Sequence, residues 1–159
     1  MSTQSTAAPV RTQVVVEAPV GRAFEVFTQD MMSWWPEDHH MLEGELAAMV
    51  FEPRVGGRIY DRNVDGGECT WARVLAYEPP DRLVFTWDIT PQWQIETDPE
   101  RCSEVEVRFI AETDSRTRVE LEHRAIERHG DGWERLSEVV ASPGGWPKTL
   151  QSYAAQLNA

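Results

Sequence analysis

The stretch from Ser103 to Ile126 reads SEVEVRFIAETDSRTRVELEHRAI, and its pattern decides the fold. Apolar side chains alternate with charged ones on both sides of a polar turn near Asp114. The side chains that share one face are Val105, Val107, Phe109, Val119, Leu121, His123 and Ala125. A period of two is typical of a β-strand with one buried face. The stretch therefore predicts an antiparallel hairpin of strands 103–111 and 118–126.

Further strand-length segments lie upstream of this hairpin. They are residues 43–52, 58–63, 68–77 and 82–89. Turns rich in glycine, proline and aspartate separate them, and the polar segment 90–101, with Pro91 and Pro99, predicts a longer connection. Consecutive strands joined mostly by short turns predict a six-strand antiparallel meander that buries one face.

The N-terminal part predicts one more strand and two short helices. Residues 10–17 have the β-branched composition of a strand. After Pro19, apolar side chains three and four positions apart predict a helix over residues 20–27. We expect a second short helix over residues 28–35, which Pro36 helps to end.

The C-terminal part predicts a helix that covers the buried face of the sheet. Apolar stripes with helical spacing occupy residues 133–140 and 150–157. Asp131 is the expected N-cap of the first stripe, and Ser-Pro-Gly-Gly at 142–145 interrupts the pattern. We therefore expect a long, interrupted helix in the trough of a curled sheet, which is an α+β architecture.

The composition is that of one folded, acidic domain. The 159 residues, 41% hydrophobic and with seven Trp, suffice for a core. A formal net charge of −12 argues against binding to nucleic acid or to an anionic membrane surface. Residues 1–8 lack the basic start and apolar run of a signal peptide. We expect a flexible tail over 1–9, a single domain over 10–159, and a cytoplasmic location.

Several short phrases, in this order of elements, carry a resemblance to a known family. They are Ala18-Pro19, Trp34-Trp35-Pro36, Pro-Arg-Val-Gly-Gly-Arg at 53–58, Glu78-Pro79-Pro80, Phe85-Thr86-Trp87 and Gly144-Gly145-Trp146-Pro147. The chain resembles the START-like (SRPBCC, helix-grip) superfamily over residues 10–158. Within it, the chain looks like the branch named for the activator of heat-shock-protein-90 ATPase.

The resemblance implies a helix-grip fold, in which a curled antiparallel sheet wraps around the C-terminal helix. It also implies an apolar cavity between sheet and helix that holds a lipid, hormone, polyketide or similar molecule. A few members of the superfamily are cyclases or hydratases. Of the eukaryotic co-chaperone, the chain resembles only the single helix-grip domain.

The candidate ligand-binding residues are those predicted to face this cavity. They are Trp71, Trp87, Phe109, His123, Trp133, Trp146 and Tyr153. Aromatic walls with a few polar groups are typical of small-molecule sites, and the same side chains also fit a packed core. His123 can hydrogen-bond a ligand or act as a general base. The alternative is a buried histidine satisfied by its neighbours.

Other candidate sites have weaker support in the sequence. Arg58 and Arg73 are possible anchors for an anionic ligand group, or else parts of exposed cross-strand charge pairs. His39 and His40 are adjacent and point in different directions, so no metal site is predicted. No GxSxG, HExxH, P-loop or GxGxxG motif is present. We assign no catalytic residue and predict no cofactor.

Three functions are compatible with these observations. The first is a binding module for a small apolar or amphipathic molecule. The second is a protein-interaction module, such as a chaperone ATPase modulator or a stress-response regulator. The third is a cyclase-like or hydratase-like enzyme. The expected partners are a small hydrophobic molecule or a chaperone, and the sequence leaves monomer and homodimer open.

Overall fold

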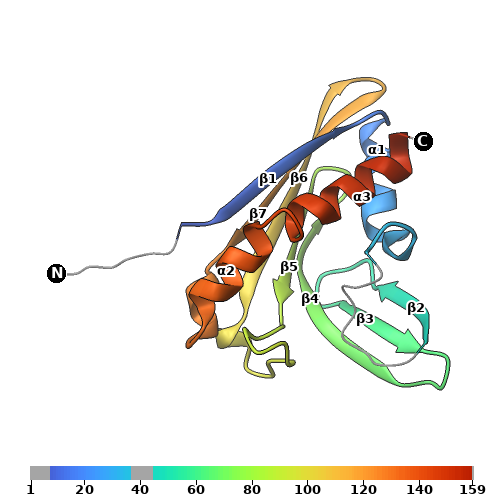
Figure 1. The fold of residues 1–159 in the computed structure, drawn as a ribbon. Coiled ribbons are helices and arrows are strands. Elements are labelled where there is room, and N and C mark those ends of the chain that lie inside the picture. Colours follow the sequence, from blue (N-terminus) through green and yellow to red (C-terminus); the bar gives the residue numbers. More distant parts are fainter. Residues whose placement is uncertain (1–7, 37–44, 159) are drawn as a thin grey trace.

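A computed structural model describes residues 8–36 and 45–158 (Figure 1). Most of the predicted tail and the pair His39-His40 lie outside these residues. The strands are β1 (Val10–Val16), β2 (Leu46–Phe51), β3 (Arg58–Asn63), β4 (Glu68–Glu78), β5 (Arg82–Trp87), β6 (Ser103–Thr113) and β7 (Arg116–Arg124). The α-helices are α1 (Val20–Thr28), α2 (Trp133–Ala141) and α3 (Trp146–Asn158).

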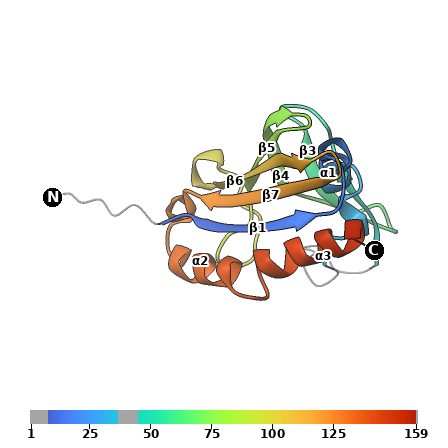
Figure 2. The same cartoon turned by 90° about the horizontal axis from the view of Figure 1, so that it is seen from above.

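The strands form one antiparallel sheet in the order β1-β7-β6-β5-β4-β3-β2. The predicted meander is confirmed as β2 to β7, and β1 joins its far edge by pairing with β7, with Val14 opposite Val119. The sheet curls, and α2 and α3 run in sequence across its concave side (Figures 1 and 2). The α+β helix-grip architecture is therefore confirmed.

The alternation of the sequence places the core on the concave face. Val105, Val107 and Phe109 are buried there, whereas Arg108 between them is exposed. The core continues into α3, which contributes Leu150 as a fully buried side chain. Burying such a side chain contributes about 1.5–3 kcal/mol, so the sheet and the helix depend on each other for stability.

The second predicted helix is only a 3₁₀ turn over Met31–Ser33. The physical reason is that the two indoles after it are both buried, at 2% exposed for Trp34 and 6% for Trp35. The Trp34 ring contacts Phe27, and its Nε1 donates to the Val26 carbonyl at 2.8 Å. A one-sided amphipathic helix would not bury two consecutive large side chains.

Several element ends differ from the sequence prediction, and local backbone geometry explains two of them. Strand β7 ends at Arg124, because Ala125 takes a left-handed φ of 60° and leads into a 3₁₀ turn over Ile126–His129. The N-cap of α2 is Gly132 at φ 93°, so the prediction of Asp131 as the cap was wrong. A Cβ at Gly132 would lie 3.0 Å from Pro91. That close approach favours glycine at the cap.

The break between α2 and α3 depends on Gly145. A Cβ at Gly145 would lie 2.3 Å from the Val140 carbonyl oxygen, whereas a Cβ at Gly144 would meet nothing within 4 Å. We expect Gly145→Ala to lower the free energy of unfolding by about 1–3 kcal/mol or more, because overpacking against backbone is costly. Gly144→Ala is the matched control and should change stability by much less. Chemical denaturation of both variants measures this, and equal effects would contradict the steric account.

Candidate functional site

The predicted cavity residues divide into two aromatic clusters along the concave face. The first cluster lies beside α1 and comprises Phe24, Phe27, Trp34, Phe109 and Tyr153. The Phe27 and Tyr153 ring centroids are 5.2 Å apart in an edge-to-face arrangement. The Tyr153 hydroxyl donates to the Ala23 carbonyl at 2.7 Å, and burial raises its pKa. The neutral phenol of Tyr153 thus joins α3 to α1 through a buried hydrogen bond.

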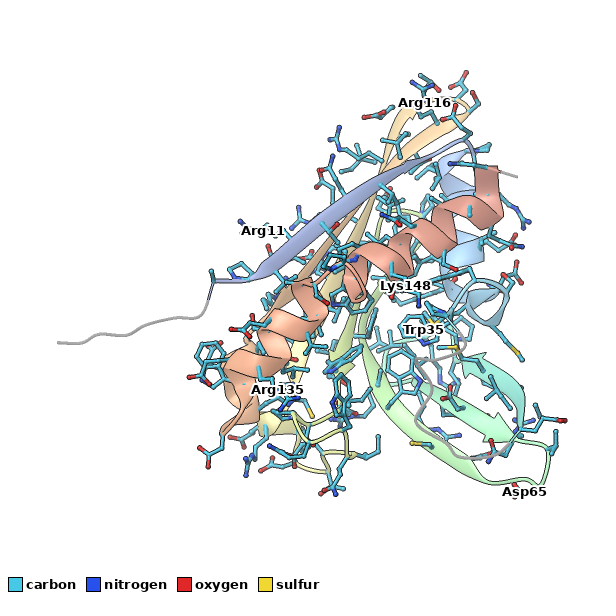
Figure 3. The ribbon with its side chains drawn as sticks, in the orientation of Figure 1. Arg11, Trp35, Asp65, Arg116, Arg135 and Lys148 are labelled. Carbon is cyan, nitrogen blue, oxygen red and sulfur yellow. The ribbon has the colours of Figure 1, made fainter. Side chains whose placement is uncertain are left out.

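The second cluster contains four indoles and one imidazole. Its members are Trp35, Trp71, Trp87, His123 and Trp146. Trp35 lies between α3 and the β2–β4 side of the sheet, close to Lys148 of α3 in projection (Figure 3). Its ring centroid is 5.1 Å from that of Trp71 and 6.1 Å from that of Trp146. We call these five residues the indole cluster.

The sequence-predicted candidates are distributed over both clusters, which meet where the ring centroids of Trp34 and Trp35 lie 5.6 Å apart. Trp71, Trp87, His123 and Trp146 meet in the indole cluster, whereas Phe109 and Tyr153 belong to the first cluster. Trp133, at the start of α2, is partly buried against the core. Whether any of them binds a ligand stays a prediction.

Both ring nitrogens of His123 are used inside the protein. The Trp146 Nε1 lies 3.1 Å from His123 Nδ1, and an indole N–H can only donate. Nδ1 is therefore the acceptor, and the neutral ring carries its proton on Nε2. That proton is donated to Ser103 Oγ at 2.7 Å. With no exposed surface and no open lone pair, His123 is not a free general base in this arrangement.

The chain of hydrogen bonds continues from Ser103 to His129. Ser103 Oγ lies 2.8 Å from His129 Nε2, and the Ser103 backbone N–H donates to the same nitrogen at 3.3 Å. His129 Nε2 therefore accepts, which assigns its proton to Nδ1. This Nδ1 is buried and has no hydrogen-bond partner within the described part of the chain.

Burial controls the charge of both histidines. Desolvation, with a smaller effect of neighbouring His129, lowers the pKa of His123 to about 3. Desolvation also lowers the pKa of His129, although the Glu96 and Asp88 carboxylates oppose the shift. The network is accordingly neutral near pH 7, which agrees with the tautomers that the hydrogen bonds require.

Sequence reasoning missed Ser103 and His129. Ser103 shares the inward face with Val105 and lies opposite Trp87 in the register, so the alternation of β6 contained the signal. His129 follows the left-handed residue Ala125 and lies outside any periodic pattern. No sequence signal placed it beside Ser103.

The two arginines proposed as anion anchors face the protein's own carboxylates. Arg58 stacks on Tyr60 at 4.3 Å and lies 3.6 Å from Glu52. Arg73 lies 3.6 Å from Asp88, a carboxylate that is 5% exposed. These contacts already supply negative charge to each guanidinium and give little support to an anionic ligand there.

The thiol of Cys102 lies in the same region as Asp88. The pKa of Cys102 is raised to about 12, mainly by burial and secondly by a hydrogen bond to the Asp88 carboxylate. Both cysteines of the chain, Cys69 and Cys102, are free thiols. Because the thiolate is the nucleophile, Cys102 is not activated for nucleophilic chemistry near pH 7.

A charged cleft of about 680 Å³ lies on the outer face, over β1, β6 and β7. At its base is Glu106, which is 6% exposed. Burial opposes its ionisation, but hydrogen bonds from Arg82, Arg124 and Arg108 outweigh that effect and lower the pKa of Glu106 to about 2. The arginines around this carboxylate are neutralised internally, so the cleft is best explained as a cross-strand ion-pair network.

The described residues contain neither a group of side chains suited to a metal ion nor a helix suited to a membrane. Among residues 8–36 and 45–158, no group of three or more His, Cys, Asp or Glu could hold a metal ion. Over the same residues, no helix is long and apolar enough to cross a membrane.

Comparison with known families decides the relationship. Residues 17–158 match the family described as activator of Hsp90 ATPase homolog 1-like protein. The chain belongs to this family. The resemblance inferred from the sequence is thus confirmed, and a comparison with curated proteins gives no match.

Solved structures of similar proteins add detail. An anthrahydroquino-γ-pyrone synthase, Txn09, is 43% identical, with a TM-score of 0.66, and the match covers 94% of this chain and 97% of that one. The self-sacrificing resistance protein CalC from Micromonospora echinospora is 29% identical, with a TM-score of 0.69 and coverage of 94% and 93%. Protein NE0264 from Nitrosomonas europaea, at 15% identity, TM-score 0.65 and coverage of 94% and 93%, shows the shared fold alone.

Removal of the central hydroxyl should destabilise this family member measurably. Ser103→Ala leaves the His123 Nε2–H without an acceptor, and an unsatisfied buried donor costs about 1–3 kcal/mol. We expect a loss of that size in the free energy of unfolding, measured by chemical denaturation. Ser115→Ala, at an exposed turn, is the control and should be neutral within about 0.5 kcal/mol. A neutral Ser103→Ala would refute the network.

The pH dependence of stability should follow the two histidines. The pKa of folded His123 is about 3, below its usual 6.5, so the unfolded chain binds more protons between these values. The neutral His123 therefore stabilises the folded protein near pH 7. This contribution to the free energy of unfolding falls by up to about 1.4 kcal/mol per pH unit as the pH drops from 6.5 towards 3. Denaturation at pH 7, 6 and 5 measures the slope.

Glu106 affects the pH dependence of stability over a separate, lower pH range. Its pKa in the folded protein, about 2, lies below the usual 4.5, so Glu106 lowers the free energy of unfolding only when the pH falls below about 4.5. A His123→Asn variant, whose side chain does not titrate, is the control and should give a shallower slope between pH 7 and 5. Unchanged stability of the wild-type protein across that range would contradict the neutral pair.

Proposed function

We propose that the protein binds a planar, oxygenated aromatic molecule of the polyketide type in its interior, at the indole cluster between the sheet and α3. The observation that carries the proposal is the cluster itself, in which four indoles from four segments of the chain contact one another and two of them contact one neutral imidazole. Flat aromatic surfaces with few polar groups are suited to flat aromatic ligands.

The class of ligand is suggested by the relative that is 43% identical. Its name describes the synthesis of an anthrahydroquino-γ-pyrone, which is a fused aromatic molecule with ring oxygens. The identity extends over 97% of that chain, so the comparison involves the whole domain. Fold alone would not justify this step, and the aromatic cluster provides the independent support.

Catalysis on the same class of molecule is a second candidate. The word synthase in the relative's name favours it. The internal hydrogen bonds of His123 do not, because a base needs an open lone pair within reach of the substrate. Conversion of a phenolic pyrone precursor by the purified protein, followed by chromatography, separates an enzyme from a binder.

A role as a protein-interaction module has less support in the molecule. On the outer face, Glu106 and neighbouring glutamates form ion pairs with arginines, so positive and negative charges are interspersed there. A chaperone partner and a role in stress response rest on the family name alone. A cytoplasmic location also stays an expectation.

Ligand binding can be tested with 1,8-dihydroxyanthraquinone as the probe. We expect saturable quenching of tryptophan fluorescence by this molecule. Trp71→Leu keeps an apolar side chain but removes a ring from the indole cluster, and it should weaken binding by about tenfold, given about 0.5–1.5 kcal/mol per aromatic contact. Trp93→Leu, at a side chain that is 50% exposed, is the control. Unsaturable quenching, or equal effects of both variants, would contradict a site in the interior.

A further inference from the structure

Trp87 lies at the centre of the indole cluster. It is the last residue of β5, and its ring centroid is 5.4 Å from those of both His123 and Trp146. The ring of Trp71 lies 5.9 Å away in an edge-to-face arrangement. Only 8% of Trp87 is exposed, so its indole is surrounded by aromatic rings.

Three other buried aromatic side chains donate their polar hydrogen to a partner inside the protein. Trp34 Nε1 donates to the Val26 carbonyl, and Tyr153 donates to the Ala23 carbonyl. Trp146 Nε1 donates to His123. Trp87 Nε1 differs from these, because it is inaccessible to solvent and has no hydrogen-bond partner within residues 8–36 and 45–158.

An unpaired N–H at this depth is costly. A buried donor without an acceptor destabilises a protein by about 1–3 kcal/mol, and an indole N–H can satisfy itself only by donating. The nitrogens of the adjacent His123 are already used by Trp146 and Ser103. Neighbouring ring faces can offer at most a weak N–H···π contact. Such a group in a native interior calls for an explanation.

We propose that the Trp87 Nε1–H donates a hydrogen bond to a carbonyl oxygen of the aromatic molecule bound in the interior. This inference rests on the proposed function and adds the orientation of the ligand. The oxygen-bearing edge of the ligand faces the end of β5, close to Ser103 and the two histidines. The flat rings then lie against the remaining indoles.

The same surroundings select a neutral oxygen. The rings nearest to Trp87 are Trp71, Trp146 and a neutral His123. A carboxylate or phosphate buried among them would have no counter-charge from these groups, and an unpaired buried charge is strongly unfavourable. A quinone or pyrone carbonyl accepts the indole proton without that penalty.

The test compares two probes that share three fused rings, 9,10-anthraquinone and anthracene, the second of which has no oxygen. Trp87→Phe removes the N–H and retains an aromatic ring. We expect this variant to bind anthraquinone about fivefold to tenfold more weakly than the wild-type protein, the value of one neutral hydrogen bond. Its affinity for anthracene should fall by a smaller factor. Trp34→Phe, which loses an N–H outside the indole cluster, is the matched control.

The possible results have distinct meanings. An equal loss of affinity for both probes would show that Trp87 contributes only packing, which overturns this inference and leaves the proposed function intact. Failure of the wild-type protein to bind either probe would overturn both.

A second readout on the wild-type protein does not depend on the folding of any variant. In ¹H–¹⁵N spectra of the indole groups, the Trp87 proton should move downfield when anthraquinone is added, and the Trp34 proton should stay. An unmoved Trp87 signal at saturation would also overturn the inference.

Discussion

The hydrogen bond from Trp146 to His123 is the contact on which the interior depends. It joins the first residue of α3 to the end of β7, and the hydrogen bond from Tyr153 to the Ala23 carbonyl attaches the same helix to α1 two turns later. Gly145 permits the first contact, because a Cβ at this position would clash with the Val140 carbonyl oxygen. The position of the helix over the concave face therefore follows from one glycine and two buried donors.

The direction of that hydrogen bond sets the chemistry of the site. Since an indole N–H cannot accept, the tautomers of His123 and His129 follow in order through Ser103. A proton cannot pass along this chain while Trp146 occupies Nδ1 of His123. The histidine that alternation places on the inward face is thus structural. Two donors near it, Trp87 Nε1 and His129 Nδ1, have no hydrogen-bond partner within the described residues.

Much of the fold could be predicted from the sequence, and less of the site. The alternation from Ser103 to Ile126 predicted the hairpin, because a period of two identifies the buried face. It does not give the distance along that face, so Phe109 and Trp87 were grouped together although they belong to different clusters. The position of His129 beside Ser103 could not be predicted, because it depends on the left-handed conformation of Ala125, which no local sequence pattern indicates.

A synthase and a resistance protein share this fold with the chain, so the fold does not choose between chemistries. Chemistry on a shared fold depends on its individual residues, and polar groups of the interior without a partner are candidates for such a role. In most of a protein such groups are eliminated, because each one lowers stability. The interior satisfies Trp34, Trp146 and Tyr153 but leaves the Trp87 N–H without a partner among the described residues, and under the proposed function this donor is a directional contact for the ligand. A single donor among neutral rings can orient such a molecule, and this is the requirement of a binding site rather than of an acid–base centre.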